Sequence, residues 1–367
     1  MSAMPLPVIE TSGSPYEMGF QHGQQAADQI RATHRRYCPA EVGSAESRAS
    51  LWPVVEATVA RLQPQALEEM RGIADGAGMT YAQIQELNFS IELWSDTFLL
   101  PPSARGCTLV GLKAATNGWL VGKTMDVSPG DEAFVLAQRA SPAEGCRYVH
   151  VTYAGTLWTD GGVNERGLAQ VNSSLMTRAQ NLGGFPVFLM ARNLLQGCGT
   201  VAEAVTAASE SDGINFGTNL LLADAGGDCA VVERSVTRHG VRRPQAGDRR
   251  LFATNHSLAA DLDAVLGGSP ALLANSRERF ERLAALSAAA EASLEALQGL
   301  FRDHARPGGF CQHGQADLHT IGAFIAGTRT RQLWVSLGPP CENPFESVLL
   351  DRPPLILEQE SNGLNSE

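Results

Sequence analysis

The sequence lacks several features that would assign it to a familiar class. Its seven cysteines are scattered, odd in number and without a Cys-x-x-Cys pair, which argues against a zinc framework or a disulfide scaffold. No apolar run approaches the length of a membrane span, and residues 1–15 lack the basic and apolar regions of a signal peptide. We therefore expect a cytoplasmic protein, with no resident metal ion and with cysteines used mainly for packing.

Positive charge is also scarce, since 28 Lys and Arg residues face 39 Asp and Glu residues, for a formal net charge of −11. This balance argues against nucleic acid or an anionic membrane as a partner. The chain has no internal repeat and no dinucleotide-binding glycine fingerprint. Segment 224–228 is too short for a calcium loop and lacks the later glutamate. With 44% hydrophobic residues in 367, the composition is that of a globular protein with an ample core.

One stretch predicts a β-hairpin with chemical groups at its open end. Two apolar runs, 108–112 and 119–121, flank the Asn117-Gly118 pair, which is the strongest short hairpin signal. Cys107 should begin the first strand and Asp126 should end the second. The hairpin would therefore bring a thiol and a carboxylate together.

Gly106 precedes Cys107 and suggests self-cleavage. A cysteine side chain can attack the peptide bond before it, and glycine leaves that carbonyl open to approach. Cleavage would give Cys107 a free α-amino group with a pKa of about 7.7–8.0, suited to a general base. The alternative from these residues alone is that Cys107 is an ordinary buried cysteine, a common fate of free cysteine.

The remaining pattern indicates an α+β sandwich. Helical periodicity is predicted for 16–36, 50–62, 64–77, 80–93, 186–196, 201–209 and 276–297. Short strands are predicted for 134–139, 147–153, 168–172, 219–223, 229–233, 251–255, 320–326 and 333–337. Gly19 and Gly23 give the first helix a small-residue face, which predicts close helix packing. His22, on the same helix, is expected to be a structural histidine.

Four motifs in order resemble the penicillin acyltransferase family, which comprises acyl-CoA:6-aminopenicillanate acyltransferase and its bacterial relatives. They are Gly106-Cys107-Thr108, Gly122-Lys123-Thr124-Met125-Asp126, the run Gly161 to Leu168, and Thr254-Asn255-His256. The similarity extends from about residue 13 to about residue 351. This family belongs to the N-terminal nucleophile hydrolases, and the more distant choloylglycine hydrolases share the Cys, the Asp and an Asn.

The resemblance implies a four-layer αββα sandwich made of two fragments. Residues 1–106 would be a helical pro-segment that stays bound as a small subunit, and residues 107–367 would be the catalytic large subunit, the two forming a heterodimer. Cleavage would occur between Gly106 and Cys107. Cys107 would be nucleophile and base, Asp126 would hold its amino group, and Asn255 would donate to the oxyanion.

Substrate recognition is expected to differ from that of the penicillin enzyme. That enzyme has an arginine in an Ile-Cys-Arg run, and Gln312 occupies the similar place here, without a charge. Three arginines are candidates to replace the missing charge: Arg279, Arg329 and Arg331. The candidate substrate-binding residues are Lys123, Val127 and Gln312.

The expected activity is cleavage or transfer of an acyl group from a small-molecule amide or thioester through a Cys107 acyl-enzyme. No cofactor is expected, and coenzyme A would be a co-substrate only for a transferase. One rival is a papain-like protease using His256 or His313. The other is an unprocessed, inactive relative that acts as a small-molecule binding or scaffold module.

Overall fold

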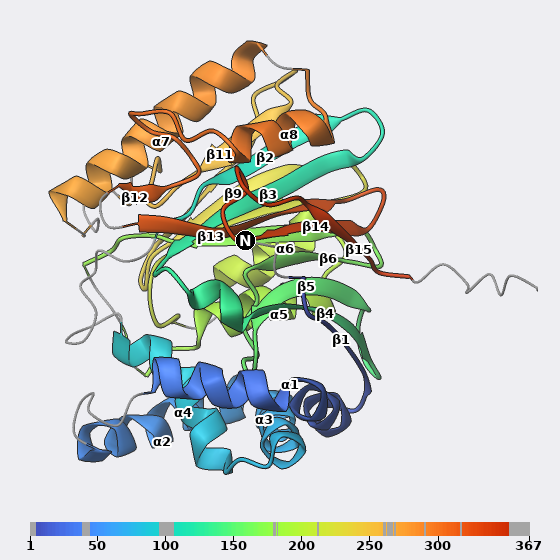
Figure 1. The fold of residues 1–367 in the computed structure, drawn as a ribbon, viewed down its shortest axis with the longest axis vertical. Helices are drawn as coiled ribbons and strands as arrows, with labels where there is room; N and C mark the ends of the chain where they lie inside the picture. Colours follow the sequence, from blue (N-terminus) through green and yellow to red (C-terminus); the bar gives the residue numbers. More distant parts are fainter. Residues whose placement is uncertain are drawn as a thin grey trace, which may run out of the picture.

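The computed structural model describes residues 5–38, 45–94, 106–178, 181, 183–210, 213–259, 262, 267, 269–289, 291–315 and 318–351. These residues form two β-sheets stacked between two layers of helices (Figure 1). The four-layer αββα sandwich is therefore confirmed. Within the described ranges, the helices are too short or too polar to cross a bilayer.

Four helices near the N-terminus form one outer layer: α1 (Pro15–Tyr37), α2 (Ala45–Leu62), α3 (Pro64–Ala77) and α4 (Tyr81–Trp94). Ser14 caps α1 by accepting from the Glu17 backbone, and Pro15 opens its first turn. Helices α1 and α3 touch through glycines on both sides. A Cβ atom at Gly19 would lie 2.0 Å from the Glu69 carbonyl oxygen, so the predicted close packing is confirmed.

The larger sheet has eight strands in the order β1-β4-β5-β6-β7-β8-β9-β10. They are β1 (Val8–Gly13), β4 (Val135–Pro142), β5 (Tyr148–Tyr153), β6 (Gly161–Asn164), β7 (Ala169–Ser174), β8 (Thr218–Ala223), β9 (Cys229–Arg234) and β10 (His239–Arg242). Strand β1 pairs with β4 in parallel, and the other pairs are antiparallel. Helices α5 (Val187–Gly197) and α6 (Val201–Glu210) contact β6 to β9.

The second sheet has seven strands, and its order is β11-β2-β3-β13-β14-β15, with β12 paired to β13. They are β2 (Leu109–Ala114), β3 (Gly118–Val127), β11 (Arg250–Ala253), β12 (His313–Gln315), β13 (Leu318–Gly327), β14 (Gln332–Leu337) and β15 (Glu346–Leu349). Helices α7 (Pro270–Ala289) and α8 (Leu294–Phe301) cover its outer face (Figure 1). A short 3₁₀ turn, η2 (Asp131–Phe134), leads from β3 into β4.

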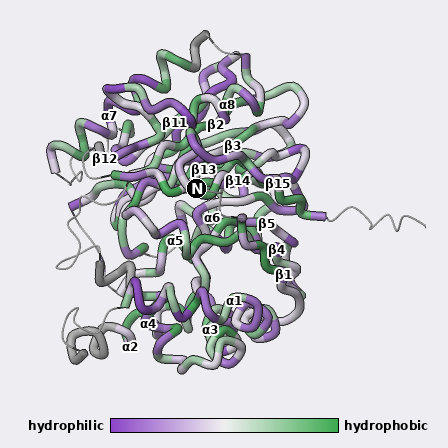
Figure 2. The backbone as a smooth tube through the Cα atoms, viewed as in Figure 1, coloured by the Kyte–Doolittle hydropathy of each residue, from purple (hydrophilic) through white to green (hydrophobic). Residues whose placement is uncertain are grey.

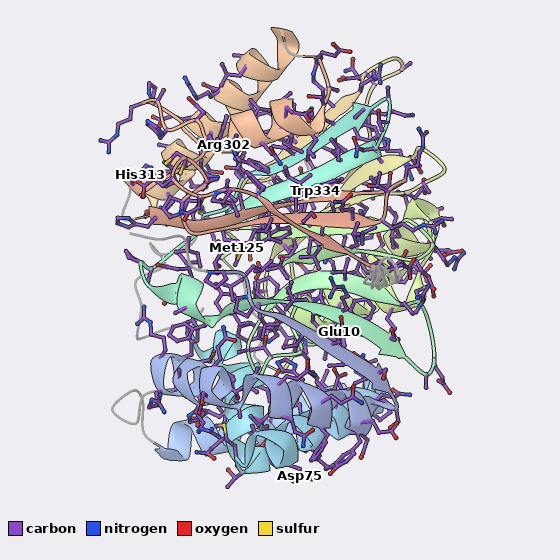
Figure 3. All side chains as sticks on the ribbon, turned by 45° about the vertical axis from the view of Figure 1, so that its right-hand side comes forward. Glu10, Asp75, Met125, Arg302, His313 and Trp334 are labelled. Carbon is purple, nitrogen blue, oxygen red and sulfur yellow. The ribbon has the colours of Figure 1, made fainter. Side chains whose placement is uncertain are left out.

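The main core lies between the two sheets. Strands β2 and β3 contact β7 and β8 across this space, and nearly every residue of these strands is buried. Figure 2 shows hydrophobic residues concentrated along the central strands. Figure 3 shows Met125 of β3 in the middle of the molecule, between the two helical layers. Residues 119–126 of β3 are all buried.

Two sequence predictions need correction. The expected helix 276–297 is two helices, because α7 already begins at Pro270 and a new N-cap, Ser293, starts α8 by accepting from the Ala296 N–H. The sequence predicts no element within residues 1–15, yet Val8–Gly13 forms an edge strand. The predicted strands correspond to β4, β5, β7, β8, β9, β11, β13 and β14.

Candidate active site

The β2–β3 hairpin forms as predicted and brings Gly106 opposite Asp126. Its register pairs Leu109 with Lys123, and the pairing extends further through an isolated bridge. The Gly106 N–H donates to the Asp126 carbonyl at 2.7 Å, and the Asp126 N–H donates to the Gly106 carbonyl at 2.9 Å. The Gly106–Cys107 peptide bond is thus fixed on its N-terminal side by two backbone hydrogen bonds.

The space around position 106 is narrow. A Cβ atom there would lie 2.7 Å from Cδ1 of Leu318 and 3.2 Å from Oδ2 of Asp126. The first separation is shorter than real Cβ contacts, so a larger residue would have to displace Leu318. Glycine therefore fits here without displacing a neighbour, and the Asp126 carboxylate lies directly beside the Gly106–Cys107 bond.

Asn255 lies on the other side of this bond, just beyond the end of β11. Its Oδ1 accepts from the Cys107 N–H at 3.0 Å, and its Nδ2 donates to the Ser174 carbonyl at 2.9 Å. The amide orientation is fixed, because Oδ1 also accepts from Nη2 of Arg279 at 2.8 Å and a guanidinium can only donate. An amide nitrogen has two hydrogens to donate. One hydrogen of Nδ2 is donated to the Ser174 carbonyl, and the second could be donated to another acceptor.

Arg279, on α7, is fully buried and holds the residues around Cys107 together. Its Nη1 donates to the Cys107 carbonyl at 2.5 Å and to Oγ1 of Thr108 at 3.1 Å, and its Nε donates to Oδ1 of Asn275 at 2.8 Å. Burial lowers the pKa of Arg279, while Asp126 and Cys107 oppose that effect. Of the three arginines considered from the sequence, this one enters the site.

The Asp126 carboxylate is buried and accepts two hydroxyl hydrogen bonds. Thr320 donates to Oδ1 at 2.6 Å and Thr124 to Oδ2 at 3.3 Å. Burial raises the pKa of Asp126, against the opposing effects of Arg279 and the two hydroxyl groups. The Cys107 N–H donates to Asn255, and Asp126 contacts the Gly106–Cys107 bond through Gly106.

Lys123 supplies a positive charge beside the thiol and is paired with Asp160. Its Nζ lies 2.6 Å from Oδ1 of Asp160, and its side chain is 2% exposed. Burial alone would lower the pKa of Lys123, but Asp160 and the Cys107 thiol raise it. Burial raises the pKa of Cys107, and Lys123 opposes that effect. A thiolate at Cys107 would thus be stabilised by the neighbouring ammonium group.

The other two candidate substrate-binding residues occupy different surroundings. Gln312 is buried; its Nε2 donates to the Gly309 carbonyl, and its Oε1 accepts from Asn275 at 3.3 Å. It lies behind Arg279, to which Asn275 connects it. Val127 is half-buried at the end of β3 and packs against the main core. A role for these residues in substrate binding stays a prediction.

Two of the three histidines discussed from the sequence, His22 and His256, are buried and make structural contacts. Nδ1 of His256 is 3.0 Å from Oγ1 of Thr254 and 2.8 Å from Oγ of Ser276, and burial lowers its pKa to about 4. Nε2 of His22 accepts from the Gly155 N–H at 3.0 Å, and burial lowers its pKa to about 4 as well. The prediction that His22 is structural is confirmed, and His256 is held by hydroxyl groups rather than aimed at a thiol.

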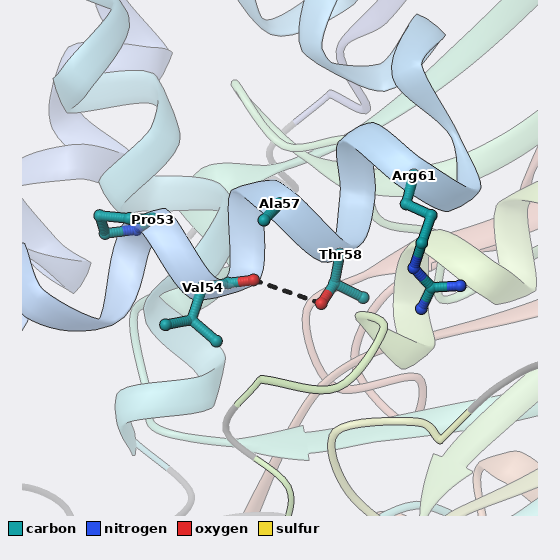
Figure 4. A pocket seen from close by; sticks show the side chains of 5 residues that line it. All are labelled: Pro53, Val54, Ala57, Thr58 and Arg61. Atoms are coloured by element: carbon teal, nitrogen blue, oxygen red, sulfur yellow. Dashed lines mark hydrogen bonds between the residues drawn. The ribbon is translucent and has the colours of Figure 1, made fainter.

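A surface hollow of about 540 Å³ lies beside α2 and is separate from these groups. It is lined by Pro53, Val54, Ala57, Thr58 and Arg61 (Figure 4). These residues come from one helix and include no thiol, carboxylate or imidazole. We therefore place the candidate active site at Cys107.

Sequence reasoning missed Asp160 and left Arg279 as one of three arginines. No local motif distinguishes either residue. Asp160 lies just before β6, and Arg279 lies in the middle of a long helix. Each reaches the site only through the packing of its layer against β2 and β3, which a single sequence does not display.

Three similar solved structures are an acylase, an amidase and a hydrolase. Penicillin V acylase from Agrobacterium tumefaciens is 16% identical, with a TM-score of 0.44 over 63% of this chain and 83% of that chain. An N-acylethanolamine-hydrolyzing acid amidase ortholog from Caenorhabditis elegans is 13% identical, with a TM-score of 0.44 over 60% and 93%. A mutant of conjugated bile acid hydrolase from Clostridium perfringens is 13% identical, with a TM-score of 0.41 over 66% and 96%.

No curated protein matches the chain. A family model matches residues 114–342, more than half of the chain. The matched range begins after Cys107 and includes Asp126, Asn255 and Arg279. The chain therefore belongs to the family described as acyl-coenzyme A:6-aminopenicillanic acid acyl-transferase.

Proposed function

We propose that this protein cleaves or transfers an acyl group of a small-molecule amide or thioester, using the thiol of Cys107 after self-cleavage of the Gly106–Cys107 bond. The observation that carries the proposal is how that bond is held. Asp126 binds both backbone groups of Gly106, while Asn255 accepts the Cys107 N–H and Arg279 donates to the Cys107 carbonyl. Family membership independently supports acyl transfer or amide hydrolysis.

The first stage is an N-to-S acyl shift. The Cys107 sulfur attacks the Gly106 carbonyl carbon, the Asp126 N–H at 2.9 Å stabilises the developing oxyanion, and the thiol proton passes to the departing Cys107 nitrogen. Water then hydrolyses the thioester. The products are a Gly106 carboxylate, a free thiol and a free α-amino group on Cys107.

The second stage is turnover at the new N-terminus. The Cys107 amine, with a reference pKa of about 7.7–8.0, takes the proton from the thiol as it attacks the substrate carbonyl. The second hydrogen on Nδ2 of Asn255 is the proposed oxyanion donor. Water or an amine then releases the acyl group, and coenzyme A enters only as the thioester donor of a transferase.

Arg279 acts as a positioning residue in this scheme. Each of its three nitrogens donates to a protein acceptor, so its hydrogen-bonding groups are engaged before any substrate arrives. We therefore do not assign to Arg279 the recognition of a substrate carboxylate, which would need an arginine with free donors. The missing charge at Gln312 favours a substrate other than a penicillin precursor.

The fragments would stay together after cleavage. Residues 5–94 supply β1 to the larger sheet and four helices to the outer layer. The buried ion pair between Glu69 and Arg192 links α3 to α5 with two hydrogen bonds of 2.8 Å. The proposed product is therefore a heterodimer of residues 1–106 and 107–367.

The test is the intact mass of the denatured protein for the wild type, Cys107→Ala and the matched thiol control Cys146→Ser. We expect two fragments, split between Gly106 and Cys107, in the wild type and the control, and one uncut chain in Cys107→Ala. Gly106→Ala should also slow cleavage, because its Cβ meets Leu318. A wild-type chain that stays whole after long incubation would overturn the proposal and favour a binding module.

A further inference from the structure

Three sulfur and nitrogen ligand atoms meet at the outer edge of the smaller sheet, and a fourth lies nearby, apart from the groups around Cys107. Sγ of Cys311 lies 3.5 Å from Sγ of Cys341 and 3.5 Å from Nε2 of His313, and that nitrogen lies 3.3 Å from Sγ of Cys341. The ligand atoms of His304, His313 and Cys341 all lie within 4.8 Å of one another. We propose that Cys311, His313 and Cys341 bind a divalent cation of the zinc type, with His304 beside them as a candidate fourth ligand.

The separations match the edges of a tetrahedron around such an ion. Zinc–sulfur bonds of about 2.3 Å and zinc–nitrogen bonds of about 2.0–2.1 Å place two sulfurs about 3.8 Å apart and a sulfur and a nitrogen about 3.6 Å apart. The observed values of 3.5, 3.5 and 3.3 Å lie slightly inside these edges. Small outward movements would therefore fit these three ligands around the ion. His304 would have to move closer to complete a Cys₂His₂ site, a common ligand set for structural zinc.

The backbone around the cluster is fixed by contacts independent of any ion. The Cys311 N–H donates to the Asp303 carbonyl at 2.9 Å, and the Asp303 carboxylate is paired with Arg282. Arg302 donates to the Pro340 carbonyl at 3.2 Å, which links the segment after α8 to the turn that carries Cys341. The site is thus preorganised from two separate segments.

Burial differs among the four ligands in a way that suits ion entry. Cys311 is buried, Cys341 is half-buried, and both histidines are exposed. His313 lies at the edge of the molecule in Figure 3. An ion can therefore approach through the imidazoles and reach the inner thiol last.

A disulfide is the other chemistry open to Cys311 and Cys341. A disulfide bond is about 2.05 Å long, whereas these sulfurs are 3.5 Å apart. In addition, Nε2 of His313 lies 3.3–3.5 Å from both sulfurs, as a third ligand of one ion would. We therefore favour the cation, and the disulfide becomes an outcome of the test.

The cation would brace the fold behind the active site. Gln312 lies between two of the ligands, and its N–H donates to Oγ1 of Thr320, which in turn donates to Asp126. The site would therefore tie the turn at Cys341 to the segment that positions Thr320. This role is separate from the proposed acyl transfer, and its test does not depend on activity.

The experiment is a zinc titration of the reduced, metal-stripped full chain against a chromophoric chelator, repeated with cobalt(II) to read its absorption. We expect one equivalent, with tetrahedral ligand-field bands and a thiolate-to-cobalt charge-transfer band. Cys341→Ser and His313→Ala should weaken binding by more than the roughly 10–100-fold typical of outer-shell changes. His313→Ala changes an exposed side chain and serves if the serine variant fails to fold.

Two controls separate this site from other thiols. Among the described residues, one further group of potential ligands exists, His34, Cys38 and Glu86, and Cys38→Ser should leave zinc binding unchanged. Cys107→Ala should also keep the full equivalent. Loss of binding in either control, absence of the charge-transfer band, or a Cys311–Cys341 disulfide with no binding after reduction would overturn the proposal.

Discussion

Replacing Arg279 by lysine separates its charge from its hydrogen-bond geometry. The guanidinium donates to Asn275, the Cys107 carbonyl, Thr108 and Asn255 at 2.5–3.1 Å. Lysine keeps the charge near Asp126 but carries its three donors on a single nitrogen. It should therefore lose about two of these bonds, each worth about 1.5–3 kcal/mol because the donor is charged. We expect the free energy of unfolding to fall by about 3–6 kcal/mol.

The assay is equilibrium urea unfolding followed by tryptophan fluorescence, in a Cys107→Ala background that keeps the chain in one piece. Arg329→Lys is the matched control, because Arg329 is exposed and donates to the Ala115 carbonyl; we expect a change within about 0.5 kcal/mol. In the cleavable chain, Arg279→Lys should also slow processing. An Arg279→Lys protein within about 1 kcal/mol of its parent would refute the positioning role, since even one lost charged bond is worth more.

Three further predictions follow from buried charges. Glu69→Gln leaves Arg192 buried without its partner, so the free energy of unfolding in urea should fall by about 3–5 kcal/mol; an unchanged value would contradict the buried pair. His22 has a pKa of about 4 in the folded protein and about 6.5 when unfolded, so the unfolded chain binds more protons between these values and stability falls as the pH falls. The wild type should lose about 3 kcal/mol from this residue between about pH 6.5 and about pH 4, and His22→Gln should flatten that slope; equal slopes in a urea series would argue against it. Asp160→Asn removes a charge that raises the pKa of Cys107, so the alkylation rate of Cys107 should show a lower apparent pKa; a higher one would mean that Lys123 has lost its proton.

The local part of the fold could be predicted from the sequence. Asn117-Gly118 predicts the β2–β3 turn, and Gly118 adopts a φ of 72° there, where a side chain would be strained. Gly167 likewise has a positive φ, in the turn before β7. These signals lie within a few residues of their effect, and the juxtaposition of Cys107 with Asp126 follows from the hairpin alone.

The elements that the sequence does not predict depend on contacts between segments that are distant along the chain. Strand β1 follows a Pro-rich start and is stabilised by pairing with β4, which lies more than a hundred residues later. The helical run 276–297 is rich in alanine, so its periodicity continues across a break that Ser293 marks only by capping α8. Cys311 and Cys341 show no metal spacing along the chain, because their proximity is created by the β13–β14 hairpin between them.

The parallel pairing of β1 with β4 has a consequence for how the N-terminus can be altered. Without Val8–Gly13, β4 would become an unpaired edge strand of the larger sheet. Unpaired edge strands can pair with strands of other molecules. The edge strand β1 carries Glu10, which is ion-paired to Arg139 at 2.8 Å. A charged side chain on an edge strand disfavours pairing with another molecule. Strand β1 therefore protects the sheet from self-association. Removing Val8–Gly13 should expose β4 as an edge strand and make the protein prone to aggregate.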